Sequence, residues 1–449
     1  MYDYDVIFIG SGHACNHGAI ALKLAGKKVA MVEQYKNGGT CTNFGCDAKI
    51  VLDGPFEYRE GISRYADLGI EVPEIDWTKL MGYKKQLIGA FDPLLGQAFA
   101  GMGIDMLHGH GKLADAHTVM VDGRPHTAEC IVIGSGARNA KLNIPGKEYT
   151  HGSSHFLDLD VMPERLVMIG AGIVSMEFAS MALELGKSVT VVEFAPRALA
   201  AYPEKYVAKM VEKMEALGAR FIFGQGVASV EEKDGAYVVK TAGGEEIEAD
   251  YVLDATGRIA NVEDLGLEEL GIEAGRRGIK VDEYLRTSVP NIFVSGDAID
   301  KTVPKLTPTA EFESNYIAMQ ILGLNPNPIQ YPVIPNLVFT LPRIAQVGVT
   351  VSEAEAHPEL YRTEVVPYGM TQSWVNNRDT EAEFTYIFDR EGYLVGAAMY
   401  GSEAAMMIDF VTLLIQKRIS GIELGQMIFA FPTQSYAIIS GLIPLMLKR

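Results

Sequence analysis

The sequence predicts an α/β fold that contains two Rossmann-like dinucleotide-binding units. A strand pattern runs into Gly-x-Gly at Gly10 and again at Gly170, and each is followed by a helical pattern, a second strand and a glutamate, Glu33 or Glu193. The chain of 449 residues is also too long for one ordinary core, which indicates about three domains.

In the first unit, Tyr4–Ile9 has the pattern of a buried parallel strand and leads directly into Gly10-Ser11-Gly12-His13-Ala14-Cys15. Gly10 permits the tight turn, and Gly12 lets the backbone approach a pyrophosphate at the N-terminus of the next helix. Glu33 ends the second strand, where a carboxylate accepts a hydrogen bond from a ribose hydroxyl.

The most distinctive stretch is Gly38-Gly39-Thr40-Cys41-Thr42-Asn43-Phe44-Gly45-Cys46-Asp47-Ala48-Lys49. The residues between Cys41 and Cys46 allow a strained loop that enters a helix, and a helix N-terminus stabilises a thiolate. Lys49 falls near the same helix face and adds positive charge. We therefore predict Cys46 as the stabilised thiolate and Cys41 as the attacking thiol; the alternative is a buried pair that never meets.

Between these units, Trp77–Gly101 has the apolar spacing of a long helix, and short strands are expected around Met106, Val119 and Ile131–Ile133. The His108-x-His110 spacing could place two ligands on one side of a strand, but no third ligand is in view. We therefore predict no metal site.

In the second unit, strand Arg165–Ile169 leads into Gly170-Ala171-Gly172-Ile173-Val174-Ser175-Met176-Glu177, and the next strand ends at Glu193. Two such units imply two bound dinucleotides. Glu193 can hold a ribose 2′-hydroxyl and would repel a 2′-phosphate, which favours NADH, whereas Arg197 keeps NADPH open as an alternative.

Composition excludes several classes of partner. The net charge of -18 argues against nucleic acid or an anionic membrane. Four cysteines are too few for a disulfide scaffold, and no signal peptide precedes the first strand, so a cytoplasmic location is expected. The apolar stretch Tyr436–Leu447 is short of the ~20 residues that span a bilayer.

The stretch Gly-Gly-Thr-Cys-x-Asn-x-Gly-Cys followed by a lysine resembles the active-site segment of the class I flavoprotein pyridine nucleotide-disulfide oxidoreductases, the family of glutathione reductase, dihydrolipoamide dehydrogenase and mercuric reductase. This resemblance implies that the first unit holds FAD, that the second binds NAD(P)H, and that an α+β C-terminal domain pairs two subunits as a homodimer. The expected domains are residues 1–145 and 263–330 for FAD, 146–262 for NAD(P), and 331–449 for dimerisation.

The resemblance also implies roles for individual residues. Cys41, Cys46, Lys49 and Glu177 would be catalytic, with Glu177 pairing with the lysine beside the flavin. Cys15 is expected to be a small packed residue, and His13 and His17 polar helix residues near the ADP moiety. The implied cofactor contacts are Gly10, Ser11, Gly12, His13, Ala14, Cys15, Glu33, Gly39, Thr40, Lys49, Gly134, Gly170, Gly172, Ile173, Val174, Glu177, Glu193, Gly257, Gly296, Asp297, Leu306, Thr307, Pro308 and Ala310.

One segment departs from the family pattern. Relatives that reduce ordinary disulfides carry His-Pro-Thr-x-Ser-Glu near the C-terminus, and here the frame begins with Phe431 and ends with Tyr436; no histidine follows His357. A positioned general acid is worth about 10²–10⁴ in rate, and most when the leaving group is a strong base. We therefore rank persulfides, polysulfides and hypothiocyanite-like oxidants at least equal to a glutathione-type disulfide as substrates.

The expected function is an NAD(P)H-dependent flavoprotein reductase that passes electrons through a Cys41–Cys46 disulfide to a small oxidised sulfur compound. Two alternatives stay open: a flavin-level reductase of quinones or oxygen, in which the cysteines are incidental, and a redox-sensing flavoprotein without turnover.

Overall fold

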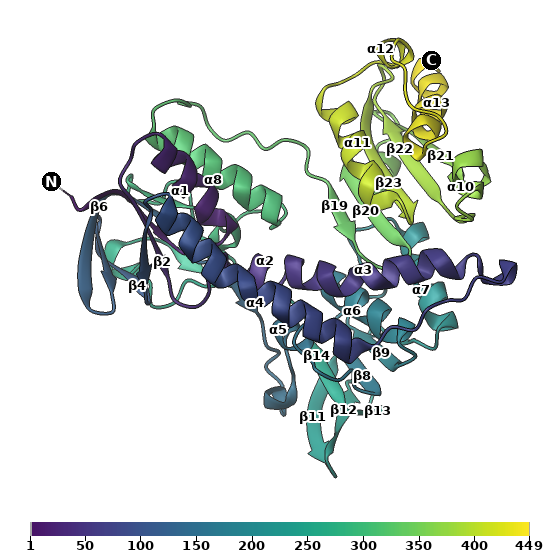
Figure 1. The fold of residues 1–449 in the computed structure, drawn as a ribbon, viewed down its shortest axis with the longest axis horizontal. Coiled ribbons are helices and arrows are strands. Elements are labelled where there is room, and N and C mark those ends of the chain that lie inside the picture. The colour runs from purple at the N-terminus through teal and green to yellow at the C-terminus, as the bar shows by residue number, and fades with distance from the viewer. Residues whose placement is uncertain (1, 449) are drawn as a thin grey trace.

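The computed structural model describes residues 2–448 as three bodies, each built on a β-sheet (Figure 1). The first sheet has seven strands in the order β3-β2-β1-β6-β5-β4, with β18 also paired to β6. Its strands are β1 (Tyr4–Ile9), β2 (Val29–Glu33), β3 (Asp105–His108), β4 (Gly111–Asp115), β5 (Thr118–Val121), β6 (Arg124–Ile133) and β18 (Ile292–Val294). The pairing of β18 with β6 shows that the chain leaves this sheet, builds the second body and returns.

Two helices lie side by side on one face of the first sheet, α1 (His13–Leu24) and α8 (Thr307–Ile321) (Figure 1). They approach closely because Gly18 has no side chain: a Cβ there would lie 2.6 Å from the carbonyl oxygen of Ser314. The Gly18 N–H donates to the Ser314 hydroxyl at 2.9 Å. Residues distant in sequence thus meet where these two helices pack against each other.

The second sheet is parallel, in the order β10-β9-β8-β14, as the alternation of strand and helix patterns predicts. It comprises β8 (Arg165–Ile169), β9 (Ser188–Glu193), β10 (Arg220–Phe223) and β14 (Tyr251–Asp254). The associated elements are α5 (Ser153–Phe156), α6 (Ile173–Glu184), α7 (Glu204–Ala216) and an antiparallel sheet of β11 (Val227–Lys233), β12 (Ala236–Thr241) and β13 (Glu246–Ala249). Two further ribbons are β7 (Ala137–Asn139) with β15 (Arg258–Ala260), and β16 (Ala274–Gly275) with β17 (Gly278–Ile279), whose Ile279 packs in the core of the first body.

The C-terminal body is an antiparallel sheet in the order β19-β20-β23-β22-β21 with helices around it. Its elements are β19 (Asn336–Val338), β20 (Arg343–Gly348), α9 (Val351–Ala356), β21 (Arg362–Val366), α10 (Gln372–Val375), β22 (Glu383–Phe388), β23 (Leu394–Gly401), α11 (Ala404–Gln416), α12 (Gly421–Gly425) and α13 (Gln434–Leu447). The apolar stretch Tyr436–Leu447 forms most of α13 and buries Ile438, Ile439 and Leu442. Within residues 2–448, no helix combines the length and apolar character that crossing a bilayer requires.

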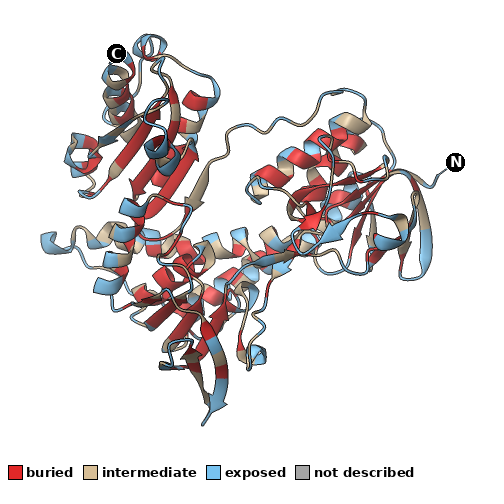
Figure 2. Cartoon of the chain, turned by 180° about the vertical axis from the view of Figure 1, so that it is seen from behind, coloured by how far each residue is buried: buried red, intermediate tan, exposed pale blue. Residues whose placement is uncertain are grey.

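Three helices connect the bodies: α2 (Gly39–Phe44), α3 (Cys46–Ser63) and α4 (Trp77–Gly101). Figure 1 shows α3 and α4 running from the first sheet toward the other two bodies. Figure 2 shows that buried residues concentrate along the three sheets and on the helix faces that cover them.

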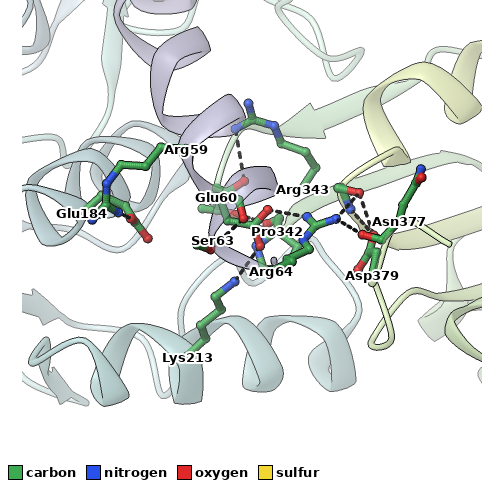
Figure 3. Close-up of polar contacts among 12 residues, drawn as sticks. Arg59, Glu60, Ser63, Arg64, Glu184, Lys213, Pro342, Arg343, Asn377 and Asp379 are labelled. Carbon is green, nitrogen blue, oxygen red and sulfur yellow. Dashed lines mark hydrogen bonds and ion pairs between the residues drawn. The ribbon is translucent and has the colours of Figure 1, made fainter. Parts of the chain in front are cut away.

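Polar contacts fix α3 to both neighbouring bodies. Glu60 accepts a hydrogen bond from Lys213 of α7 at 3.2 Å, and Arg64 donates to the carbonyl oxygen of Asn377 at 3.5 Å (Figure 3). Nearer the start of α3, Asp53 accepts two hydrogen bonds from Arg343, whose side chain is 1% exposed. A buried pair of this kind is costly to break, so α3 holds the cysteine segment in a fixed frame.

Candidate active site

A cavity of about 1070 Å³ lies at the carboxyl ends of β1 and β2, between the first sheet and the start of α3. In open parallel sheets this edge is where nucleotides bind. The residues singled out from the sequence that line it are Gly10, Ser11, Gly12, His13, Ala14, Glu33, Gly39, Thr40, Cys41, Cys46, Gly134, Asp297, Leu306, Thr307 and Ala310.

The glycines of this cavity form a cradle that fits the pyrophosphate of FAD. Gly10 has a φ of +117°, and a Cβ there would stand 2.5 Å from the carbonyl oxygen of Gly134. A Cβ on Gly39 would stand 2.9 Å from the Cα of Gly12. Gly12 also precedes α1 without a side chain to cap it, so the N–H groups of His13 and Ala14 are left for an anion, whereas the Cys15 N–H donates to the Gly12 carbonyl oxygen.

The two acidic residues at the strand ends are held in the same way. Glu33 accepts from the Ser11 N–H at 3.1 Å and the Tyr35 N–H at 2.9 Å. Glu193 accepts from the Ala171 N–H at 2.6 Å and the Ala195 N–H at 2.7 Å. Each carboxylate is therefore fixed by the backbone on both sides, at the place where a ribose is expected.

The two cysteines meet at one wall of the cavity, around a single hydroxyl. The Thr307 Oγ1 lies 3.1 Å from the Cys41 Sγ and 3.6 Å from the Cys46 Sγ, and both cysteines are free thiols. The prediction of a strained loop between them is wrong: Cys41 belongs to the short helix α2, and only Gly45 separates α2 from α3. Gly45 makes this possible because it adopts φ −141° and ψ −116°, which breaks the helix without a loop.

The environment separates the acidities of the two sulfurs. A hydrogen bond from Cys41, then the Thr307 hydroxyl and the Lys49 charge, lower the pKa of Cys46 to about 6 although burial opposes this. The same hydrogen bond and burial raise the pKa of Cys41 well above its usual value. The direction of the two shifts favours the proton on Cys41 and the negative charge on Cys46 near neutral pH.

Behind the cysteines, Lys49 and Glu177 form an ion pair, with the Lys49 Nζ 3.1 Å and 3.0 Å from the two carboxylate oxygens. Phe339, which sequence reasoning missed, donates its N–H to Glu177 at 2.8 Å and places its ring 3.8 Å from the Lys49 Nζ. Burial raises the pKa of Glu177, while the Lys49 charge opposes that shift. The pair joins α3 to α6 and so couples the first body to the second.

Gly296 and Asp297 follow β18, and Asp297 lines the cavity. Gly296 lies so close to α1 that a Cβ would stand 2.6 Å from the Cβ of Ala14. Among residues 2–448, no side chain pairs with the Asp297 carboxylate, and burial raises its pKa. A half-buried carboxylate left free in the cavity fits the sugar-like chain of FAD, whose hydroxyls donate.

Other predicted contacts do not line this cavity. Cys15 is fully buried, and its Sγ lies 2.2 Å from where a Cβ on Gly134 would stand, so it is a packed residue as expected. Lys49, Glu177, Gly296 and Pro308 also do not line it, and Gly170, Gly172, Ile173, Val174, Glu193 and Gly257 belong to the second body.

The cavity also includes residues that sequence reasoning missed, among them Asn139, His151, His155, Arg258 and Lys305. Arg258 stands next to the predicted contact Gly257, a signal that could have found it. Lys305 likewise directly precedes the predicted contact Leu306, whereas Asn139, His151 and His155 lie in segments without a predicted contact.

Of the substituted acid–base positions, Phe431 precedes α13 and Tyr436 lies in its first turn. Their rings meet edge to face at 5.1 Å, and 63% of Phe431 is exposed. Neither lines the cavity.

The sequence also matches known protein families. Residues 4–314 match the model of the pyridine nucleotide-disulphide oxidoreductases, and residues 334–440 match the dimerisation domain of the same family.

Individual relatives agree over nearly the whole chain. The chain is 30% identical to a glutathione reductase of Burkholderia cepacia, covering 96% of this chain and 97% of that enzyme. It is 30% identical to a dihydrolipoyl dehydrogenase of Bacillus subtilis, covering 96% and 93%. The solved HOCl-induced flavoprotein disulfide reductase RclA of Escherichia coli shares the fold with a TM-score of 0.89, at 24% identity and with 99% and 100% of the two chains covered.

Members of this family use FAD and NAD(P)H, and the cavity has the cradle, acids and paired thiols that such chemistry requires. The chain therefore belongs to the pyridine nucleotide-disulphide oxidoreductases.

Proposed function

We propose that this enzyme reduces a small oxidised sulfur compound at the expense of NADH, with Cys41 and Cys46 as the last electron carriers. The observation that carries this proposal is the arrangement of two thiols of unequal acidity around Thr307 at the wall of the cavity. Bound FAD would supply the two-electron centre between NADH and the disulfide form of the pair.

The one proton that the cysteine pair holds is enough to balance the reaction in which the dithiol reduces the substrate. The Cys41 sulfur attacks the substrate sulfur, and its proton moves to the Cys46 thiolate. The first product leaves as a thiolate or other anion. Cys46 then attacks Cys41, closes the disulfide and releases the second product, to which its proton passes. One dithiol monoanion thus reduces R–S–S–R′ to one thiol and one thiolate.

This balance bears on the substrate. Because the pair brings one proton for two leaving groups, one product departs as an anion unless another acid protonates it. Phe431 holds the position of the family's histidine and cannot donate a proton, and Tyr436 stands where the family has a glutamate. Substrates with weakly basic leaving groups, such as persulfides, polysulfides and hypothiocyanite-like species, therefore suit this site at least as well as glutathione disulfide.

The test is a panel of acceptors assayed by NADH oxidation: disulfides, a persulfide, a polysulfide, hypothiocyanite and quinones. We expect the weakly basic leaving groups to react fastest and Cys41→Ser to abolish their reduction. The double variant Phe431→His/Tyr436→Glu should gain selectively on glutathione disulfide. Efficient reduction of glutathione disulfide by the wild type would refute the assignment of substrate, and full activity of Cys41→Ser with a quinone would favour flavin-level transfer.

The second body favours NADH. Glu193 is fixed by two backbone N–H groups where a 2′-hydroxyl is expected. Arg197 turns away and donates to the carbonyl oxygens of Leu199, Ala200 and Tyr202 at 3.1, 2.7 and 3.1 Å. Its guanidinium is therefore engaged rather than free for a 2′-phosphate.

The working unit that we propose is a homodimer in the cytoplasm. The chain carries the family's dimerisation domain, and apolar side chains there are exposed in the single chain, including Ile428 at 100% and Phe431 at 63%. We assign these exposed side chains of the dimerisation domain to the subunit interface. A reducing compartment suits a dithiol that must be regenerated. Light scattering that gives a monomer mass would contradict the dimer.

A further inference from the structure

Three ligand-type side chains converge where α1 and α8 begin. His13 and His17 lie four residues apart on α1, and Glu311 comes from α8. The Glu311 Oε1 lies 3.0 Å from the His13 Nδ1 and 3.3 Å from the His17 Nε2. The two ring nitrogens are 3.3 Å apart, and the rings are stacked. One atom from each side chain thus forms a nearly equilateral triangle.

The size of this triangle matches a metal coordination sphere. Ligands that surround Zn²⁺ tetrahedrally at about 2.0–2.1 Å are about 3.3 Å from one another. An ion slightly above the plane of the three atoms therefore reaches all of them at bonding distance. Two imidazoles and one carboxylate also form an open zinc site, in which the fourth position is left for water or another ligand.

Protons alone serve this arrangement less well. The same Glu311 oxygen faces both histidines, and the two ring nitrogens face each other. A proton on one of these three atoms can form a hydrogen bond to only one of the other two. A cation at the centre is bound by all three atoms at once. The side chains are 25% (His13), 36% (His17) and 35% (Glu311) exposed, which leaves a path for an ion to enter.

We propose that His13, His17 and Glu311 bind a divalent transition-metal ion of the zinc type, which ties α1 to α8. His13 also lines the cavity, and Glu311 lies four residues, about 6 Å along the helix, after Thr307, whose hydroxyl contacts both cysteines. The site is therefore separate from the dithiol but close to it. It replaces the expectation of no metal site, because the third ligand comes from a helix that the sequence does not place.

The test uses untagged, FAD-loaded enzyme with its disulfide oxidised, dialysed against low-micromolar Zn²⁺ and analysed for metal per chain. We expect about one Zn²⁺ per chain. His17→Ala and Glu311→Gln should each weaken binding by at least about 100-fold, because even a residue that only hydrogen-bonds to a metal ligand is worth about 10–100-fold. With Co²⁺ in place of Zn²⁺, ligand-field bands beyond the flavin absorption should appear in the wild type and be lost in both variants.

His357→Ala is the matched control, because it removes an exposed histidine that lies 3.2 Å from Glu359 and, within residues 2–448, has no third ligand beside it. Its metal content should equal that of the wild type. The Cys41→Ser/Cys46→Ser double variant should also keep the ion. The proposal is overturned if the wild type binds no more Zn²⁺ than His17→Ala and Glu311→Gln, or if the double cysteine variant loses it, since the thiols would then be the binding site.

A second readout does not depend on metal analysis. An ion that binds only the folded protein raises its melting temperature, so Zn²⁺ should stabilise the wild type and His357→Ala. Glu311→Gln keeps the shape of the side chain, which makes it the safer variant for this comparison. Equal stabilisation of Glu311→Gln by Zn²⁺ would refute the site.

Discussion

The two nucleotide-binding units are nearly the same in backbone but differ in what their helices face. In both, the turn begins with a glycine at positive φ, +117° at Gly10 and +92° at Gly170. In both, a second glycine caps a helix of 12 residues in an extended conformation, Gly12 before α1 and Gly172 before α6. The shared motif therefore builds one local cradle twice.

The helices then diverge. The helix α1 leaves His13 and His17 partly exposed next to α8, and its N-terminus opens into the large cavity. In α6, by contrast, the stretch from Ser175 to Leu183 is buried, and Glu177 points at Lys49 of the first body. The motif thus determines where a dinucleotide lies, and the neighbours of each helix decide what chemistry stands beside it.

The largest effect should come from changing the cysteine pair, which has no counterpart in the second body. Replacing Cys46 by serine should lower sulfur-dependent NADH oxidation by about 10⁴-fold or more, as removal of a nucleophilic group commonly does. Cys130→Ser, in β6 and away from the cavity, is the control and should leave the rate unchanged. If Cys46→Ser kept more than a few per cent of the activity, the dithiol would not be the carrier.

Equivalent glycines should respond differently. In Gly10→Ala the Cβ would stand 2.5 Å from a backbone oxygen, whereas in Gly170→Ala the nearest atom, the Ala255 oxygen, is 3.0 Å away. Because backbone strain of about 1–3 kcal/mol adds to the clash, we expect FAD affinity to fall by about 100-fold or more in Gly10→Ala. Gly170→Ala should keep its FAD and instead raise the KM for NADH. Flavin content after gel filtration and NADH kinetics separate the two results, and FAD loss from both would break the comparison.

Replacing the two acids, Glu33 and Glu193, should also have different effects, and these should be smaller than those of the glycine substitutions. Hydrogen bonds to a charged group are worth about 1.5–3 kcal/mol, so Glu193→Ala should reduce kcat/KM for NADH by about 10–100-fold and affect NADPH less. Glu33→Ala should weaken FAD binding without changing the ratio of NADH to NADPH. An unchanged ratio in Glu193→Ala would show that this carboxylate does not select the nucleotide.

The smallest effect concerns the pKa of Cys46. Because the pKa of Cys46 is lowered to about 6, the reduced enzyme should hold the thiolate above that pH and lose it below. Alkylation of Cys46 by iodoacetamide, followed by peptide mass spectrometry, should have its midpoint near that pH. Cys41→Ala removes the largest cause and should move the midpoint upward, and Lys49→Met should move it upward less. A midpoint at the ordinary thiol value of about 8.5 in the wild type would contradict the assignment.

The sequence by itself determined the local parts of this protein. Strand Tyr4–Ile9, helix Trp77–Gly101 and strand Arg165–Ile169 have the predicted bounds, because buried-strand and helical patterns are set by neighbouring residues. The turns at Gly10 and Gly170 were equally visible, since a positive φ calls for glycine wherever the chain folds.

Only the tertiary structure decided what meets at a distance. Thr307 reaches both cysteines, Phe339 supports Lys49 and Glu177, and Glu311 closes the triangle with His13 and His17. The direct joining of α2 to α3 at Gly45 was likewise missed, because the spacing of two cysteines allows a loop or a helix equally well. Side chains from helices far apart in sequence acquire a shared chemistry through packing, and packing leaves no periodic signal in the chain.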